Sequence, residues 1–273
     1  MTTENRTDDL IGLVSSSKIY DLGQRYWKGM PVHPADPPFV FFLYRYHEHT
    51  AKLFKEIAPG FADSIGYMTT SMHSGTHLDM PVHMSRNLKV LGEDITKYED
   101  DRGYVDVPDK FMTVDRIQPI VRRAVLFDVP KSKNLDILPE RYEITPQDLE
   151  NTLAAEKVTL NPGDCALIRT GYSRFFEKDS DAYLHKFAGL GAAAAKWLVE
   201  KGTHLVGVDN LAAGVPKPFE VHNIILTDNG RFLMKSLYLE ELAKDGKFVS
   251  MVMVSPLRII GGEASLVRPI AIA

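Results

Sequence analysis

The sequence predicts a single α/β domain, and three observations support this fold class. In the second half of the chain, short apolar runs typical of buried strands alternate with segments of helical pattern. The 273 residues are 44% hydrophobic and 25% charged, which is ordinary for a globular protein. The chain shows no internal repeat, low-complexity tract or linker. A chain of this length can bury a core that needs no disulfide bond.

The first half of the chain contributes the less regular elements. Residues 1–15 are polar and lack apolar periodicity, so we expect a flexible lead-in before a domain that spans residues 16–273. Three strands and one proline-rich loop should follow. They are a strand at residues 19–22, the loop at 31–38, and strands at 39–46 and 65–71.

The second half carries the alternation of strands and helices. Thr145 and Pro146 predict a helix start, as N-cap and first helical residue. A second helix is expected over residues 192–201, and Gly202 should end it. The polar, charged segment 172–185 suits a surface loop or an irregular helix. The apolar runs expected to be strands are residues 125–129, 165–168, 205–208 and 248–254.

Charge and composition exclude several classes of function. The net charge of −4 offers no basic patch for nucleic acid and no polybasic membrane anchor. No stretch approaches the roughly 20 apolar residues that span a bilayer. The N-terminus lacks the apolar region of a secretory signal, so we expect a cytoplasmic protein. The single cysteine, Cys165, has apolar neighbours and suits a buried strand thiol better than a nucleophile.

The most informative segment is a cluster of histidines in residues 71–83. His73, His77, Asp79 and His83 are separated by even numbers of residues, so an extended segment would project all four to one side. A helix could also pair His73 with His77, although the glycine, threonine and proline between residues 75 and 81 disfavour one.

Two imidazoles and one carboxylate suit Zn²⁺, Mn²⁺ or Fe²⁺. Three protein ligands would leave a coordination position open, as catalytic metal sites do. A hydrogen-bonded histidine cluster without metal would fit the composition equally well. The residue types alone leave both interpretations open.

Other motifs are weaker. Residues 189–194 match G-x-G-x-x-A and Asp209 follows at a suitable distance, but no convincing strand precedes Gly189, so close helix packing explains the glycines better than dinucleotide binding. The chain has neither a G-x-S-x-G elbow nor a P-loop. The aromatic residues of segment 39–46 suit a core or a subunit interface. The remaining histidines, expected to be surface or ordinary core residues, are His33, His47, His49, His185 and His204.

Residues 73–83 fit H-x-G-T-H-x-D-x-P-x-H, which resembles the signature of the cyclase family. That family includes bacterial kynurenine formamidase, isatin hydrolase and some dienelactone hydrolases. The resemblance extends over most of the chain. Segments 29–38, 167–172, 206–209 and 261–268 are also similar to family segments. It implies a swivelling β/β/α fold that assembles as a homodimer or homotetramer.

The resemblance also implies roles for individual residues. His73, His77 and Asp79 would bind the metal, and His83 would act beside it as a proton carrier or as a ligand to a second ion. His222 matches another histidine that faces the same site. Formamidases of the family carry a glutamate about a dozen residues later. Here Lys235 or Ser236 takes that position, which favours one metal, Mn²⁺ or Zn²⁺, and a likeness to isatin hydrolase.

The expected function is therefore metal-dependent hydrolysis. A bound divalent ion lowers the pKa of its water toward about 7 and polarises a carbonyl. We expect such water to open a cyclic amide such as isatin to isatinate, with His83, His222 and Ser236 as catalytic groups. Phe61 and Met80 could line a pocket for a flat ring, or belong to the core. The alternatives are arylformamidase activity on N-formylkynurenine, lactone hydrolysis, and a non-catalytic protein that binds metal or ligand.

Overall fold

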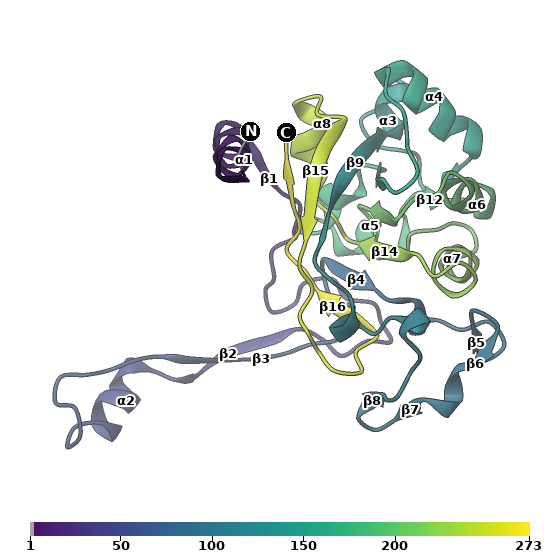
Figure 1. Cartoon of the computed structure of the whole chain (residues 1–273). Coiled ribbons are helices and arrows are strands. Elements are labelled where there is room, and N and C mark those ends of the chain that lie inside the picture. The colour runs from purple at the N-terminus through teal and green to yellow at the C-terminus, as the bar shows by residue number, and fades with distance from the viewer. Residues whose placement is uncertain (1–2) are drawn as a thin grey trace.

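In the computed structural model, which describes residues 3–273, a nine-stranded sheet forms the centre of the chain (Figure 1). Its four inner strands, β9, β11, β13 and β14, are parallel, and the strands on both sides of them are antiparallel. This arrangement confirms the predicted α/β class. In spatial order the strands are β1 (Ile19–Asp21), β17 (Ile270–Ile272), β15 (Val249–Val254), β9 (Ile120–Asp128), β11 (Cys165–Arg169), β13 (Leu205–Val208), β14 (Phe232–Lys235), β4 (His77–Asp79) and β16 (Ala264–Leu266).

The helices between the parallel strands cover one face of the sheet. Side chains from α4, α6 and α7 join one buried apolar cluster with alternate residues of the strands, such as Ala166 and Ile168 of β11. The helices of the chain are α1 (Thr3–Ser16), α2 (His47–Leu53), α3 (Val129–Ser132), α4 (Pro146–Glu156), α5 (Ser180–His185), α6 (Ala192–Glu200), α7 (Pro218–His222) and α8 (Glu240–Lys244). A π-helix, Asn223–Thr227, follows α7.

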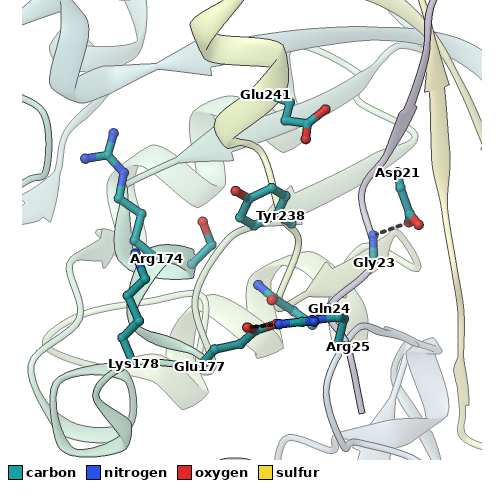
Figure 2. Close-up of a pocket in the computed structure, with 10 residues that line it drawn as sticks. Asp21, Gly23, Gln24, Arg25, Arg174, Glu177, Lys178, Tyr238 and Glu241 are labelled. Atoms are coloured by element: carbon teal, nitrogen blue, oxygen red, sulfur yellow. Dashed lines mark hydrogen bonds and ion pairs between the residues drawn. The ribbon is translucent and has the colours of Figure 1, made fainter.

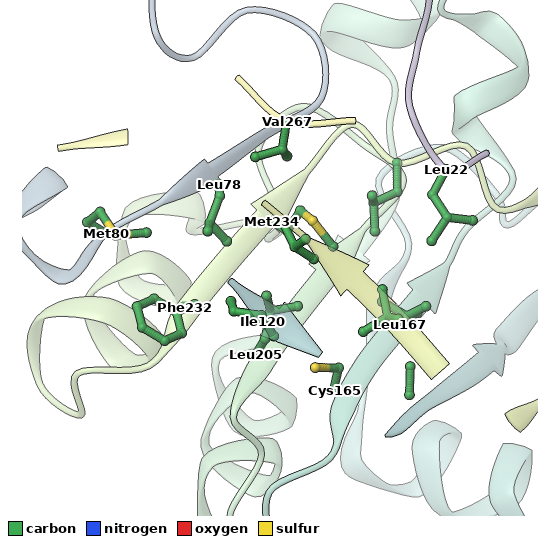
Figure 3. Packing of buried hydrophobic residues seen from close by; sticks show 14 of the residues in the cluster. Leu22, Leu78, Met80, Ile120, Cys165, Leu167, Leu205, Phe232, Met234 and Val267 are labelled. Atoms are coloured by element: carbon green, nitrogen blue, oxygen red, sulfur yellow. The ribbon is translucent and has the colours of Figure 1, made fainter. Parts of the chain in front are cut away.

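The opposite face of the sheet packs a second apolar cluster (Figure 3). Cys165 and Leu167 point into this cluster, whereas their neighbours in β11 point to the helices. Strand β11 is therefore buried on both faces, which is why it reads as a continuous apolar run. Cys165 is fully buried, as the sequence predicts.

Both predicted helix boundaries in this part of the chain are confirmed. Thr145 caps α4, its hydroxyl accepts a hydrogen bond from the Asp148 backbone, and the Asp148 side chain accepts one in return. Pro146 is the first residue of α4. Helix α6 ends at Glu200, just before Gly202, which adopts a φ of +78° that favours glycine.

Two segments differ from the predictions. Residues 3–16 form α1, where we predicted a lead-in without regular structure. Leu10 and Leu13 of α1 are exposed, so the helix depends on its local hydrogen bonds more than on the core. Segment 172–185 is irregular helix, as expected, and its residues 177–181 are exposed. Two of its own residues, Tyr172 and Tyr183, are nevertheless buried in the core. The many charged residues of the segment had suggested a more exposed position.

A long hairpin extends away from the body of the molecule (Figure 1). It consists of β2 (Val40–Arg45), α2 and β3 (Ile65–Thr69), and we call residues 40–69 the arm. Its aromatic residues belong to no core in this chain. Phe41, Tyr44 and Tyr67 are each about half exposed. Shorter two-stranded pairs are β5 (Lys89–Val90) with β6 (Glu93–Asp94), β7 (Glu99–Asp100) with β8 (Gly103–Tyr104), and β10 (Glu143–Ile144) with β12 (Gly189–Leu190).

No helix among residues 3–273 has both the length and the apolar character needed to cross a membrane.

Arg169, at the end of β11, joins three elements through buried ion pairs. Its guanidinium lies 2.7 Å from Asp128 at the end of β9 and 2.9 Å from Glu240 at the start of α8. Arg169 is only 4% exposed. Because Asp128 and Arg169 end neighbouring parallel strands and α8 begins beside them, this one side chain links all three elements.

We expect Arg169→Met to lower the free energy of unfolding by about 3–5 kcal/mol, because it leaves buried carboxylates without their partner. Urea denaturation measures this change. The matched control is Arg268→Met, which breaks an exposed pair with Asp21 and should lower the stability far less, because solvent screens such pairs. Equal losses in the two variants would contradict the assignment.

Candidate metal centre

Strand β4 places two of the predicted ligands. It lies between β14 and β16, and its pairing with β14 sets His77 opposite Lys235. Leu78 and Met80 point into the apolar cluster of Figure 3. Side chains alternate along a strand, so His77, Asp79 and Lys235 lie on the other, helix-covered face. Asp79 and His77 are fully buried there.

The other two histidines come from outside the strand. Residues 73–83 are not one extended segment as the even spacing suggested. His73 lies in a turn before β4, and His83 ends the 3₁₀-helix Pro81–His83 that follows it. The ring of His83 nevertheless packs against that of His73, with centroids 3.9 Å apart. The chain thus folds both flanks of β4 back over the strand.

Gly75 and Tyr26 shape the turn that presents His73. Gly75 has a φ of +55°, and a Cβ at this position would lie 2.7 Å from the Tyr26 ring. The Tyr26 hydroxyl contacts two carbonyl oxygens of the turn, at 2.7 Å from Ser74 and 3.0 Å from Thr76. The glycine of the motif is therefore required by both conformation and space.

The hydrogen bonds of His77 show that a cation fits this site. Its Nδ1 lies 2.7 Å from the Gly75 carbonyl and must donate to it, so Nε2 carries a lone pair. That nitrogen lies 3.3 Å from Asp79 Oδ1. His77 Nε2 is buried with no hydrogen-bond partner, and Asp79 Oδ2, buried too, has no hydrogen bond but lies 3.2 Å from the Lys235 ammonium. Two electron-rich groups that face each other in this way are stabilised when a cation binds between them.

Three residues offer ligand atoms that all lie within 4.8 Å of one another, namely His73, Asp79 and His83. This is the one such group among the described residues. It shares His73 and Asp79 with the predicted ligand set and contains His83 in place of His77. The complete set of His73, His77 and Asp79 remains a prediction. Histidine nitrogens and a carboxylate suit Mn²⁺ or Zn²⁺.

Glu263 is a member of the site that we did not predict. Its carboxylate lies 3.3 Å from His73 Nε2, while His73 Nδ1 lies 2.9 Å from Asp79 Oδ1. Glu263 directly precedes β16, the strand that pairs with β4. It belongs to the segment 261–268 that carries part of the family resemblance, which was the available signal.

Lys235, rather than Ser236, faces these residues. Its ammonium lies 3.2 Å from Asp79 Oδ2 and 3.3 Å from His222 Nε2, and Lys235 is 7% exposed. The predicted catalytic role of Ser236 is not supported. Its hydroxyl is buried and accepts a 2.7 Å hydrogen bond from Tyr183, because the chain turns sharply after β14.

Burial and charge separate the histidines into two kinds. Burial lowers the pKa of His83 well below its usual range, and burial together with Lys235 lowers that of His222 to about 4. Burial acts in the same direction on His73, but hydrogen bonds to Asp79 and Glu263 raise its pKa to about 9. His83 and His222 are therefore neutral at pH 7, while a metal would have to displace a proton from His73.

Lys235 dominates the charge balance at Asp79. Burial acts to raise the pKa of Asp79, but Lys235 and the neighbouring histidines hold it well below the usual range. The carboxylate is therefore ionised and available as a ligand. A fully buried carboxylate stays charged only because cationic or donor groups surround it.

A cavity of about 350 Å³ opens beside the histidines. Its lining combines polar and apolar residues, which suits a flat ring that carries a reactive carbonyl. The polar lining consists of His33, Asp36, His73, His83, His222 and Lys235. The apolar lining consists of Ala35, Met84, Leu211, Ala212, Pro218 and Phe219.

The predicted substrate-binding residues are not in this lining. Met80 is fully buried in the sheet core, because strand alternation directs it away from His77 and Asp79. Phe61 lies in the arm, between α2 and β3, where it packs against Phe54. His33, which we expected to be an ordinary residue, does line the cavity. Sequence spacing could not reveal this contact, since forty residues separate His33 from His73.

The other motifs take structural roles. A Cβ on Gly191 would lie 2.4 Å from Glu143, so close packing before α6 explains that glycine. Asp209 is fully buried and accepts hydrogen bonds from the backbone of Thr170 and Gly171. A larger polar hollow lies elsewhere (Figure 2), of about 380 Å³, lined by residues of both charges such as Arg174 and Glu241. It contains no histidine.

Comparison with known proteins points to one family. The family model described as Cyclase matches residues 20–215. A kynurenine formamidase of Sphingopyxis alaskensis is 28% identical over 93% of this chain and 97% of its own. An isatin hydrolase of Roseibium aggregatum is 26% identical over 89% of this chain and 86% of its own.

The fold is also shared with a solved structure. The crystal structure of a novel cyclase superposes with a TM-score of 0.85 at 25% identity, over 100% of this chain and 92% of the other. The region matched by the family contains the whole histidine cluster and more than half of the sequence. The chain therefore belongs to the cyclase family of metal-dependent hydrolases.

Proposed function

We propose that this hydrolase opens a cyclic amide such as isatin, with one divalent ion, Mn²⁺ or Zn²⁺, held by His73, His77 and Asp79. The observation that carries the proposal is the position of Lys235. Its ammonium lies 3.2 Å from Asp79, and such a charge disfavours a second dication beside the first. The apolar lining of the adjacent cavity suits the flat ring of such a substrate.

When bound, the ion supplies an acidic water and polarises a carbonyl. His83 is neutral and lines the cavity, so it can take the proton that the water loses. The water oxygen then forms a bond to the carbonyl carbon, and the bond from that carbon to nitrogen breaks. His83 returns its proton to the leaving nitrogen. The product carries a carboxylic acid and an amine, and the acid then releases its proton to solvent to become the carboxylate.

His222 has a positioning role in this mechanism. Its Nδ1 lies 2.8 Å from the Pro218 carbonyl, to which it must donate, so Nε2 accepts a hydrogen bond from Lys235. With both nitrogens engaged, His222 holds Lys235 in place. This positioning role takes the place of the catalytic role that we expected for His222 from the sequence.

Arylformamidase activity is the second candidate. The formamidase of S. alaskensis is at least as similar to this chain as the isatin hydrolase, and an N-formyl group presents the same kind of amide carbonyl. Lactone hydrolysis needs the same groups with oxygen as the leaving atom. A non-catalytic protein that binds a metal or ligand stays the alternative from another class. The cytoplasmic location also stays a prediction.

We further propose that the protein is a homodimer or homotetramer assembled through the arm. A two-stranded ribbon is marginally stable in water by itself. Nevertheless, Phe41, Tyr44 and Ile57 of the arm are 51%, 59% and 82% exposed. Exposed apolar surface of this extent is typical of a subunit interface.

Two variants should separate metal binding from proton transfer. Asp79→Ala removes the central carboxylate and should abolish binding of Mn²⁺ and Zn²⁺. His83→Ala should retain the metal and lower kcat by about 100-fold or more, because it removes the proton carrier. Metal content by mass spectrometry and kcat on the same samples decide the matter. Loss of metal from His83→Ala would instead show that His83 is a ligand. Its ring nitrogen is close enough to His73 and Asp79 for this role.

The substrate is tested with metal-stripped enzyme resupplied with Mn²⁺ or Zn²⁺. We expect it to open isatin, and to do so only with metal, whereas N-formylkynurenine should react more slowly. Preference for the formamide would contradict the lactam proposal and favour the second candidate. Metal binding without hydrolysis of either compound or of a lactone would favour the non-catalytic alternative.

Assembly is tested by charge insertion on the arm. The double variant Tyr44→Lys with Ile57→Lys should shift the oligomer toward monomer in sedimentation analysis. The matched control is Leu10→Lys with Leu13→Lys on α1, where the leucines are also exposed. A monomeric wild-type protein, or an arm variant that keeps the wild-type mass, would overturn the role of the arm.

A further inference from the structure

Lys235, in the wall of the cavity, has an N–H group that no described residue accepts. An ammonium carries three N–H groups. Its two polar contacts, at 3.3 Å from His222 Nε2 and 3.2 Å from Asp79 Oδ2, account for at most two of them. Within residues 3–273 the structure shows no third acceptor. Lys235 lines the cavity together with His83 and Phe219, so the cavity is where a third acceptor can bind.

The position of this ammonium is fixed by rigid structure. Lys235 ends β14, whose pairing with β4 sets it opposite His77. His222 is held in turn by the Pro218 carbonyl of its own helix, which leaves its Nε2 lone pair to accept from the lysine. Only 9% of the Lys235 side chain is exposed. Strand pairing and the His222 ring therefore both orient the buried ammonium. A charged donor fixed in this way is preorganised to bind an acceptor in one position.

We propose that Lys235 donates a hydrogen bond to the substrate carbonyl oxygen as that oxygen becomes negatively charged. The inference rests on the proposed hydrolysis and adds a catalytic residue to it. When the attacking oxygen bonds to the carbonyl carbon, the electron pair of the C=O π bond moves to the carbonyl oxygen. The Lys235 N–H lies within the lining of the cavity where that oxygen must be. When the C–N bond breaks, the pair returns and the charge at this oxygen is dispersed over the product carboxylate.

The chemistry explains why a lysine suits this place. A neutral side chain at position 235 would leave Asp79 Oδ2 without its ion-pair partner. An ammonium satisfies Asp79 and still keeps a donor for the reacting oxygen. Because the oxygen gains charge only during the reaction, the interaction strengthens in the transition state and raises kcat more than it lowers KM.

Lys235→Met tests the role in turnover, since it keeps the length of the side chain and removes the charge and donors. We expect kcat to fall by about 100- to 1,000-fold, with KM changed little and metal content retained. Lys235→Gln keeps an N–H donor without the charge and should lose less. The matched control is Lys217→Met, which removes an exposed charge just before α7 and should keep wild-type kcat. Unchanged kcat in Lys235→Met, or loss of its metal, would overturn the proposal.

A binding experiment decides the same point without turnover. Benzoate presents a charged oxygen on a flat ring, and benzamide is its neutral analogue. In calorimetry with metal-free protein, we expect the wild type and Lys217→Met to prefer benzoate roughly tenfold, since hydrogen bonds to charged groups are the stronger ones. Lys235→Met should lose this preference. If the preference survives in Lys235→Met, or is absent from the wild type, Lys235 does not bind the oxygen. If no substrate is hydrolysed but the preference for benzoate depends on Lys235, the proposed reaction is wrong. The contact between Lys235 and a charged oxygen is then still supported.

Discussion

The site depends on one fully buried carboxylate, Asp79, in the middle of a sheet. An ionised carboxylate in such a place is costly unless cations and donors surround it. Here His73 donates to it from a turn and Lys235 approaches it from the neighbouring strand, while the unprotonated nitrogen of His77 faces it from its own strand. The same negative charge that the fold must balance is what makes the site attractive to a metal ion.

Strand pairing places the charged and polar side chains around Asp79. Alternation along β4 directs Leu78 and Met80 to the core and leaves His77 and Asp79 on the face that the helices cover. Pairing with β14 adds Lys235 to this face, and pairing with β16 brings Glu263 to His73. The sheet therefore positions groups that are nearly two hundred residues apart in the chain.

The cavity and the arm show two different uses of apolar surface. Beside the histidines, apolar side chains such as Leu211 and Phe219 form a concave wall where a ring can replace water. On the arm, apolar side chains project from a thin ribbon that has no core of its own. The first arrangement suits a small molecule, and the second suits a large complementary surface.

The sequence by itself determined the α/β class, the caps of α4 and α6, and the histidine segment, because each depends on neighbours a few residues apart. Only the tertiary structure decided that Lys235 rather than Ser236 faces the site, that Met80 belongs to the core, and that Glu263 and His33 join the histidines. Those contacts depend on strand register and on turns between distant segments. Local pattern cannot specify them, since a shift of one residue in a strand reverses which side chains face the site.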